Sequence, residues 1–204
     1  QCIGRAGYVI DGVMLKTLAA AYATVHDDEM ELGSILIDLG GGTTDVMVLN
    51  KSAPVFTASI PVGGNLVTND IAIVKGISNS AAEKIKLESG CCWVTGSEAD
   101  EEVIIPGVGG RPPEQTTRYE LCQIIEPRMD EILSMVRREV VRKANLTKLS
   151  GSIVLTGGGA LMPGIVELAQ SVFGTTAVRI GESADLGGLD ASYRTADYAT
   201  AVGL

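Results

Sequence analysis

Asp38-Leu39-Gly40-Gly41-Gly42-Thr43-Thr44-Asp45 is a glycine-rich turn with an aspartate at each end. The apolar runs on either side of it, residues 34–37 and 46–49, both predict buried strands. A Rossmann or Walker phosphate loop must lead from its glycines into a helix, and the Walker loop also needs Gly-Lys-Ser/Thr. The turn meets neither condition, so the sequence predicts a strand hairpin with a glycine loop at its tip.

The composition of this turn suits a phosphate. Three successive glycines let a ligand approach the backbone closely and offer their amides to an anion, and the two threonines add hydroxyl donors. The predicted phosphate-binding residues are Gly40, Gly41, Gly42, Thr43 and Thr44.

The two aspartates predict a metal site. Asp38 ends a buried strand and could hold hydrated Mg²⁺ on the phosphate, with Asp45 in a supporting role, because magnesium takes carboxylate and water oxygens. The alternative interpretation is a tight hairpin in which an aspartate merely caps the turn.

A second glycine triplet, Gly157-Gly158-Gly159, follows a strand-like run at residues 152–156, and residues 162–169 after it look helical. A bare glycine backbone leaves room for a flat ring or a sugar. Two glycine clusters at strand ends, far apart in the sequence, predict one nucleotide held in a cleft.

These loops resemble those of the actin-like ATPase superfamily, whose members carry an Asp-x-Gly-Gly-Gly-Thr-x-Asp phosphate loop and a later Thr-Gly-Gly-Gly adenosine loop. Within it, the chain is similar to the FtsA family of bacterial cell-division proteins. Gly109-Gly110-Arg111-Pro112-Pro113 looks particular to FtsA, whereas the glycine loops are generic. The stretches that carry the resemblance are residues 61–72, 82–86, 105–113, 125–128, 154–160 and 199–204.

The resemblance implies an α/β fold: an actin-like ATPase domain with a ribonuclease H-like β-β-β-α sheet, helices and a smaller inserted α+β subdomain. It covers essentially the whole chain but only the second half of the family, and the start at Gln1 without methionine suggests a fragment. The implied parts are the end of a first actin-like domain (1–32), a nucleotide-binding subdomain (33–75 and 150–190), an inserted subdomain (76–149) and a closing helix that returns toward the first domain (191–204).

The resemblance also implies ATP and Mg²⁺ as cofactors. The resemblance assigns adenosine binding to Gly157-Gly158-Gly159 together with Glu83 and Lys86. These last two residues share one face of a predicted helix. An ordinary surface ion pair is the alternative for Glu83 and Lys86. Phosphoryl transfer needs nucleophile, metal and phosphate clamps in one closed site. A fragment with half of those groups is therefore not expected to be active, and the resemblance implies at most weak ATPase activity in the full-length protein.

By the same resemblance the protein is an adaptor that tethers FtsZ filaments at the cytoplasmic face of the membrane during septum formation, and the full-length protein self-associates into filaments. Two rivals within the superfamily are a small-molecule kinase and a rod-shape or pilus-assembly actin homologue. The stretch at residues 109–113 favours the division protein over both.

Four cations near the end of a long helical pattern form a basic cluster: Arg137, Arg138, Arg142 and Lys143. The resemblance predicts that this cluster binds the acidic and apolar C-terminal tail of FtsZ. The alternative is that the cations only complement the helix dipole and solvate the surface.

The composition narrows the classes of partner. The chain has 204 residues, 46% of them hydrophobic, and a net charge of −9, which argues against general affinity for nucleic acid or anionic lipid. Four cysteines without CxxC spacing and one histidine do not make a zinc site, so reduced thiols in a cytoplasmic protein are expected. No apolar run approaches the ~20 residues of a membrane helix.

Local patterns predict further elements. Residues 11–23 predict a helix capped by Asp11, with an acidic loop at 27–29 after it. A capping box at 80–83 opens another helix. Pro127 is expected to divide a long helix into two segments. Two short strands are expected at 91–95 and 102–105, and a helix at 193–204.

Overall fold

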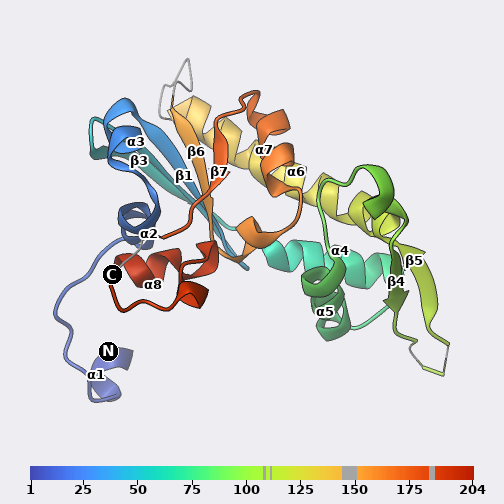
Figure 1. Cartoon of the computed structure of the whole chain (residues 1–204). Helices are drawn as coiled ribbons and strands as arrows, with labels where there is room; N and C mark the ends of the chain where they lie inside the picture. The colour runs from blue at the N-terminus through green and yellow to red at the C-terminus, as the bar shows by residue number, and fades with distance from the viewer. Residues whose placement is uncertain (108, 111, 144–150, 184–186) are drawn as a thin grey trace.

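The glycine-rich turn belongs to a five-stranded sheet in the computed structural model, which describes residues 1–107, 109–110, 112–143, 151–183 and 187–204. The strand order is β3-β2-β1-β6-β7 (Figure 1). The first three strands in sequence are antiparallel, and β6 and β7 run parallel to β1. The expected β-β-β-α order is confirmed, because a helix, α4 (Gly64–Lys75), follows the third strand. The strands are β1 (Ser34–Leu39), β2 (Thr44–Asn50), β3 (Ala53–Ile60), β6 (Ser152–Thr156) and β7 (Val178–Ile180).

Helices cover both faces of this sheet. Leu36 and Met47 pack in a cluster with α2 (Lys16–Thr24) and α8 (Ala199–Gly203) on one face. Ile35 and Ile37 point to the other face, where α6 (Arg118–Lys143) and α7 (Ile165–Phe173) lie (Figure 1). Burial of both faces explains why the strands are apolar throughout rather than alternating.

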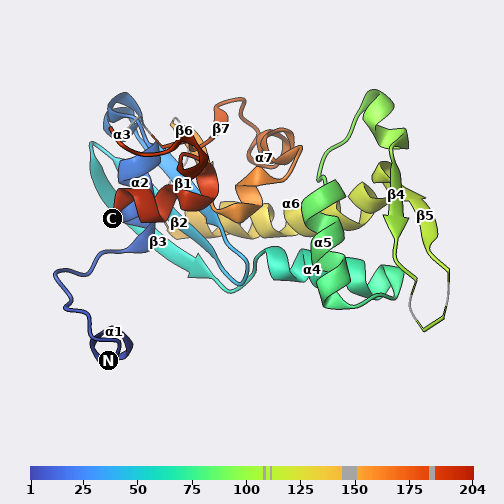
Figure 2. The same cartoon turned by 60° about the horizontal axis from the view of Figure 1, so that its bottom comes forward.

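A smaller lobe extends from one end of the sheet. It contains α4, α5 (Asn79–Ser89), the antiparallel pair β4 (Glu102–Ile105) and β5 (Glu114–Thr117), and the first half of α6. Figure 2 shows α6 running from the sheet into this lobe. Side chains of its second half, such as Val136 and Val140, are fully buried in the same cluster as the sheet residues. The remaining short elements are α1 (Cys2–Arg5), α3 (Asp27–Leu32) and the 3₁₀ turns at Gly96–Asp100, Gly158–Leu161, Ala191–Tyr193 and Ala196–Tyr198.

The predicted start of the first long helix was wrong. The helix α2 begins at Lys16 rather than at Asp11, and Tyr8, Val9 and Val13 before it are exposed. The helix α2 packs on the sheet, whereas residues 8–15 are exposed, and a short helix without tertiary packing is marginal in water. The expected acidic loop is instead α3, in which the His26 amide donates to the Glu29 carboxylate at 2.9 Å.

Two details of the smaller lobe also differ from prediction. Residues 91–95 form no strand, because Cys92 donates its amide to the Pro163 carbonyl at 2.9 Å and so pairs with a loop. The partner of β4 is β5 instead. The helix α5 is capped by Ser78, whose hydroxyl accepts from the Ala81 amide at 3.3 Å, rather than opening at Ser80.

Pro127 does not divide the long helix as predicted. It lies inside the continuous helix α6, which loses one backbone hydrogen bond there. Buried side chains on both sides of the proline, including Ile125 and Met129, keep the two halves in register against the core. The predicted closing helix is also shorter, since 3₁₀ turns precede α8. None of the helices formed by the described residues has the length and apolar character needed to span a bilayer.

Candidate functional site

The tip of the β1–β2 hairpin is tied to the start of α4. Within the turn, the Gly40 amide donates to the Thr43 carbonyl at 3.0 Å. The Gly64 amide donates to the Gly40 carbonyl at 2.9 Å. The Asn65 amide donates to the Gly41 carbonyl at 2.8 Å. These bonds fix the position of the turn relative to the smaller lobe.

Backbone amides are the donors left at this tip. In the described part of the chain, no hydrogen bond engages the amides of Gly41 and Gly42. The Thr43 hydroxyl donates to Asp45 Oδ2 at 2.9 Å, and the Thr44 hydroxyl donates to a backbone carbonyl at 2.9 Å. Since both threonine hydroxyls already donate hydrogen bonds within the protein, the glycine amides are the groups that could hold an anion.

The two aspartates at the ends of the turn share a cation. Asp38 and Asp45 are direct neighbours across β1 and β2. The Lys16 ammonium lies 3.1 Å from Asp38 Oδ2 and 2.6 Å from Asp45 Oδ2. Burial works to lower the pKa of Lys16, but hydrogen bonds and attraction from the carboxylates outweigh it and raise that pKa. Burial works to raise the pKa of Asp45, and hydrogen bonds from Lys16, Ser59 and Thr43 outweigh it and lower that pKa.

This carboxylate pair is compatible with magnesium bound together with a phosphate. Among the described residues, no three acidic, histidine or cysteine side chains are grouped as a complete metal cage. Magnesium, however, usually keeps several waters and binds one or two carboxylates plus substrate phosphate oxygens. Asp38 and Asp45 fit this arrangement because they flank the glycine turn and already attract a positive charge.

The three glycines of the second loop have different surroundings. A Cβ on Gly157, whose φ is +81°, would lie 2.4 Å from Asp38 Oδ1. A Cβ on Gly159 would lie 2.7 Å from the Leu39 Cβ. A Cβ on Gly158 would meet nothing within 4 Å. Gly157 and Gly159 therefore permit close packing against β1, and Gly158 leaves open space.

Glu83 and Lys86 form a hydrogen-bonded pair on α5. The Lys86 ammonium lies 2.7 Å from Glu83 Oε2 and donates to the Thr68 hydroxyl at 2.9 Å and the Gly64 carbonyl at 3.3 Å. Burial works to raise the pKa of Glu83, but hydrogen bonds from Lys86 and Thr68 outweigh it and lower that pKa. The Lys86 side chain is only 10% exposed, so this is a built-in network that joins α5 to the start of α4.

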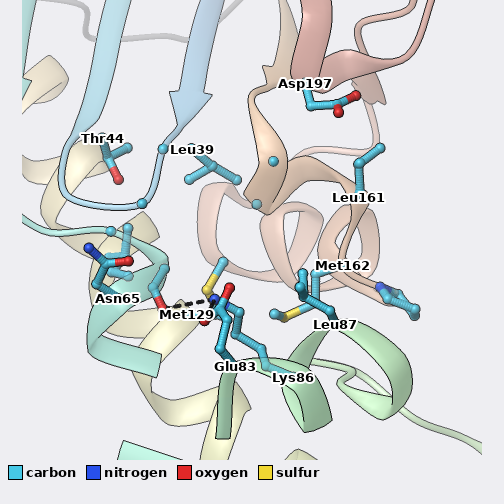
Figure 3. Close-up of a pocket in the computed structure, with 18 residues that line it drawn as sticks. Leu39, Thr44, Asn65, Glu83, Lys86, Leu87, Met129, Leu161, Met162 and Asp197 are labelled. Carbon is cyan, nitrogen blue, oxygen red and sulfur yellow. Dashed lines mark hydrogen bonds and ion pairs between the residues drawn. The ribbon is translucent and has the colours of Figure 1, made fainter. Parts of the chain in front are cut away.

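A cavity of about 390 Å³ lies between the two glycine loops and α5 (Figure 3). Figure 3 shows the Glu83 and Lys86 side chains on one side of it and Leu161 and Met162 on another. The lining includes seven predicted site residues: Gly40, Gly41, Thr44, Glu83, Lys86, Gly158 and Gly159. The other five residues predicted to bind the nucleotide or the metal do not line it: Gly42, Thr43, Gly157, Asp38 and Asp45.

Several lining residues were missed by sequence reasoning. Gly63, Gly64 and Asn65 open α4 beside the glycine turn, and two glycines directly before a predicted helix were a usable signal. A Cβ on Gly63 would lie 2.4 Å from the Gly40 carbonyl oxygen, so the position has no space for a side chain. Asp197 and Met129 also line the cavity and carried no local signal.

The basic cluster lies at the end of α6. Arg137, Arg138, Arg142 and Lys143 are exposed, and Glu139 pairs with Arg142 at 3.0 Å and with Lys143. A separate groove of about 360 Å³ runs beside them. The groove is lined by Ile60, Met135, Arg138, Glu139 and Arg142.

Comparison with known proteins matches one family over most of the chain. The family model described as cell division protein FtsA matches residues 35–203. A cell division protein FtsA of Borreliella burgdorferi is 41% identical over 205 residues, covering 100% of this chain and 49% of that protein. The FtsA of Pseudomonas aeruginosa is 40% identical over 204 residues, again covering 100% and 49%. The chain thus spans about half the length of the curated relatives it matches.

The solved structure of MreB5 of Spiroplasma citri bound to ADP shares the fold. It matches with a TM-score of 0.73 at 20% identity, covering 98% of this chain and 60% of that chain. At this identity the likeness concerns the fold alone, and it confirms the predicted actin-like α/β architecture.

Proposed function

The chain belongs to the FtsA family of cell division proteins, and from this premise we propose that it binds ATP with Mg²⁺ in the cavity between the two glycine loops. The observation that carries the proposal is the cavity itself, because loops more than a hundred residues apart in the sequence line one space. Its volume of about 390 Å³ falls in the range of small-molecule sites, roughly 300–1,000 Å³.

The contacts suggest how each part of the nucleotide would be held. The free amides of Gly41 and Gly42 suit the phosphates, since aligned backbone amides bind anions. The open space at Gly158 suits the ring or sugar, because a bare backbone allows close approach. The Glu83 carboxylate, held in place by Lys86, offers an acceptor to ribose or adenine on the facing side. Bound magnesium would supply positive charge to the phosphates, with Asp38 and Asp45 as its protein ligands.

We further propose that the chain serves as part of an adaptor for FtsZ filaments, with the basic cluster as the docking surface for the FtsZ C-terminal tail. Two features support this placement. Four exposed cations stand within seven residues of a chain with net charge −9. The adjacent groove has Ile60 and Met135 on its walls, so it could accept apolar side chains while the cations attract acidic ones. Action at the inner membrane face and assembly into filaments complete the proposed role.

The nucleotide proposal is tested with Gly158→Val in the full-length gene product. The new side chain would enter the cavity, and it requires no strained φ and clashes with no described atom within 4 Å of the Cβ position. We expect a folded protein that loses at least about tenfold in ATP affinity, because the ring or sugar can no longer approach the backbone. Isothermal titration calorimetry measures the affinity, and a thermal melt checks the fold.

Gly12→Val is the matched control. A Cβ on Gly12 would also meet nothing within 4 Å, and the φ is ordinary, but Gly12 lies in the exposed segment before α2. This variant should bind ATP as the unaltered protein does. If folded Gly158→Val binds ATP with unchanged affinity, the assignment of the cavity is wrong.

A further inference from the structure

Lys16 occupies the position that the metal proposal assigns to magnesium. It is the first residue of α2, and its ammonium contacts Asp38 Oδ2 at 3.1 Å and Asp45 Oδ2 at 2.6 Å. The side chains of the two aspartates are only 10% and 11% exposed. Lys16 thus neutralises part of a nearly buried pair of negative charges, for which unpaired burial would be costly.

The charge balance of this cluster is incomplete. Two carboxylates face one ammonium, and the other side chains that bond to Asp45, those of Thr43 and Ser59, are neutral hydroxyls. A divalent cation would compensate both carboxylates, so the pair should attract one strongly if the ammonium were absent.

Lys16 is also placed so that it can leave. Its side chain is 45% exposed, in contrast to the aspartates. The residues before it form no helix from Gly7 to Leu15, so the ammonium stands at the end of an extended segment rather than inside a packed element. Moving its head group into water would cost little packing.

We propose that Lys16 is a tethered counter-ion that competes with magnesium for the Asp38–Asp45 pair and thereby sets how strongly nucleotide binding depends on the metal. This rests on the magnesium role proposed above for the two aspartates. Without nucleotide the ammonium holds the pair. With magnesium and the phosphates bound, the ammonium would leave both carboxylates and turn into water.

The test is Lys16→Gln in the full-length gene product, with ATP affinity measured by calorimetry in excess Mg²⁺ and in EDTA. Removing the competitor should strengthen binding of MgATP or leave it unchanged. Removing a positive charge beside the phosphates should weaken binding of metal-free ATP. The dissociation constant for metal-free ATP, divided by that for MgATP, should therefore rise by about tenfold or more. Lys51→Gln, which removes the same charge from an exposed turn, should leave the ratio unchanged.

A second measurement needs no nucleotide. Mn²⁺, used as a spectroscopic probe for the divalent site, should bind Lys16→Gln at least about tenfold more tightly than the unaltered protein by electron paramagnetic resonance. Adding Asp38→Asn to this variant should remove the gain. If the unaltered protein binds no ATP, the proposed function fails, whereas the Mn²⁺ titration still decides the role of Lys16.

The variant remains informative if it is destabilised. If the loss of the counter-ion lowers the melting temperature of Lys16→Gln, millimolar Mg²⁺ should raise it again by binding the two buried carboxylates. Equivalent ionic strength from KCl should not have this effect. An unstable Lys16→Gln that Mg²⁺ does not restore would overturn the proposal. So would a stable variant with the metal dependence and Mn²⁺ affinity of the Lys51→Gln control.

Discussion

Gly157 packs directly against the Asp38 side chain: a Cβ on Gly157 would lie 2.4 Å from Asp38 Oδ1. The same Cβ would lie 2.7 Å from the Leu39 carbonyl oxygen, and the φ of Gly157 is +81°. The second glycine loop therefore meets the end of β1 at the carboxylate proposed to hold magnesium. A glycine in this loop matters for packing as well as for ligand access.

This contact predicts opposite outcomes at two adjacent glycines. Gly157→Ala should destabilise the fold by about 2 kcal/mol or more, because the methyl group meets backbone and carboxylate atoms and the φ is unfavourable. Gly158→Ala should change the free energy of unfolding by less than about 0.5 kcal/mol, since its methyl group enters open space. Urea denaturation followed by circular dichroism measures both. Equal stabilities of the two variants would contradict the close packing at Gly157.

A second prediction separates a metal ligand from a hairpin cap at Asp38. In the full-length gene product, Asp38→Asn should weaken MgATP binding by about tenfold or more and metal-free ATP binding much less, because the carboxylate acts through the metal. A capping role would instead lower the melting temperature and leave the affinity of the folded protein unchanged. Calorimetry with and without Mg²⁺, alongside a melt, distinguishes them, and equal losses under both conditions would exclude the metal role.

Local sequence patterns predicted the hairpin correctly. The apolar runs at residues 34–37 and 46–49 became β1 and β2, and the glycines between them form the turn. These features depend on neighbours in the sequence, so they are visible without a structure. The cap of α6 is local in the same way, because the Thr117 hydroxyl accepts from the Glu120 amide at 3.2 Å.

The rest depended on contacts between distant residues. Lys16 reaches the two aspartates only because α2 packs beneath the same strands, and no local motif marks it. Pro127 predicts a helix break because proline has no amide hydrogen to donate. The helix continues because buried side chains on both sides of the proline hold it against the core. The strand β5 was missed because its polar sequence, Glu114–Thr117, carries no apolar alternation. Arg111, within the stretch that resembled FtsA most specifically, lies outside the described residues.

A third prediction concerns pH. Glu29 of α3 forms a two-point ion pair with Arg179 of β7, with Nε donating to Oε1 at 2.9 Å and Nη2 also bonded to the carboxylate. Burial works to raise the pKa of Glu29, but hydrogen bonds from Arg179 and the His26 amide outweigh it and lower that pKa from 4.5 to about 2. Because the folded-state pKa lies below the ordinary value, the stabilisation is complete above about pH 4.5 and is lost as the pH falls toward 2.

Glu29→Gln should therefore cost about 1–2 kcal/mol at pH 7, a figure reduced for solvent screening of this partly exposed pair. Glutamine can still accept from the His26 amide, so the change isolates the charge. The difference from the unaltered protein should shrink as the pH is lowered from 4.5, as measured by urea denaturation at several pH values. Glu31→Gln, exposed on the same helix, is the control and should show no such trend. A Glu29→Gln deficit that stays constant down to pH 2.5 would contradict the role of the ion pair.

The last prediction concerns the basic cluster at the end of α6. Val140 is fully buried and Val141 is 48% exposed, so Val141 is the apolar side chain that stands among the cations. Reversing Arg137, Arg138 and Arg142 to glutamate should weaken binding of an FtsZ tail peptide by more than about tenfold at low salt, and by less as salt rises, because exposed charges act mainly through long-range attraction. Val141→Ser should instead raise the dissociation rate with little change in salt dependence.

Fluorescence anisotropy of a labelled peptide at two ionic strengths, with stopped-flow dissociation, measures both effects, and circular dichroism checks that α6 remains folded. Reversal of Arg5, Lys51 and Lys84, three exposed cations away from the groove, supplies the control with the same change in net charge. If the triple reversal binds the peptide at low salt no worse than this control, the FtsZ tail docks elsewhere and the cations of α6 serve only its helix terminus.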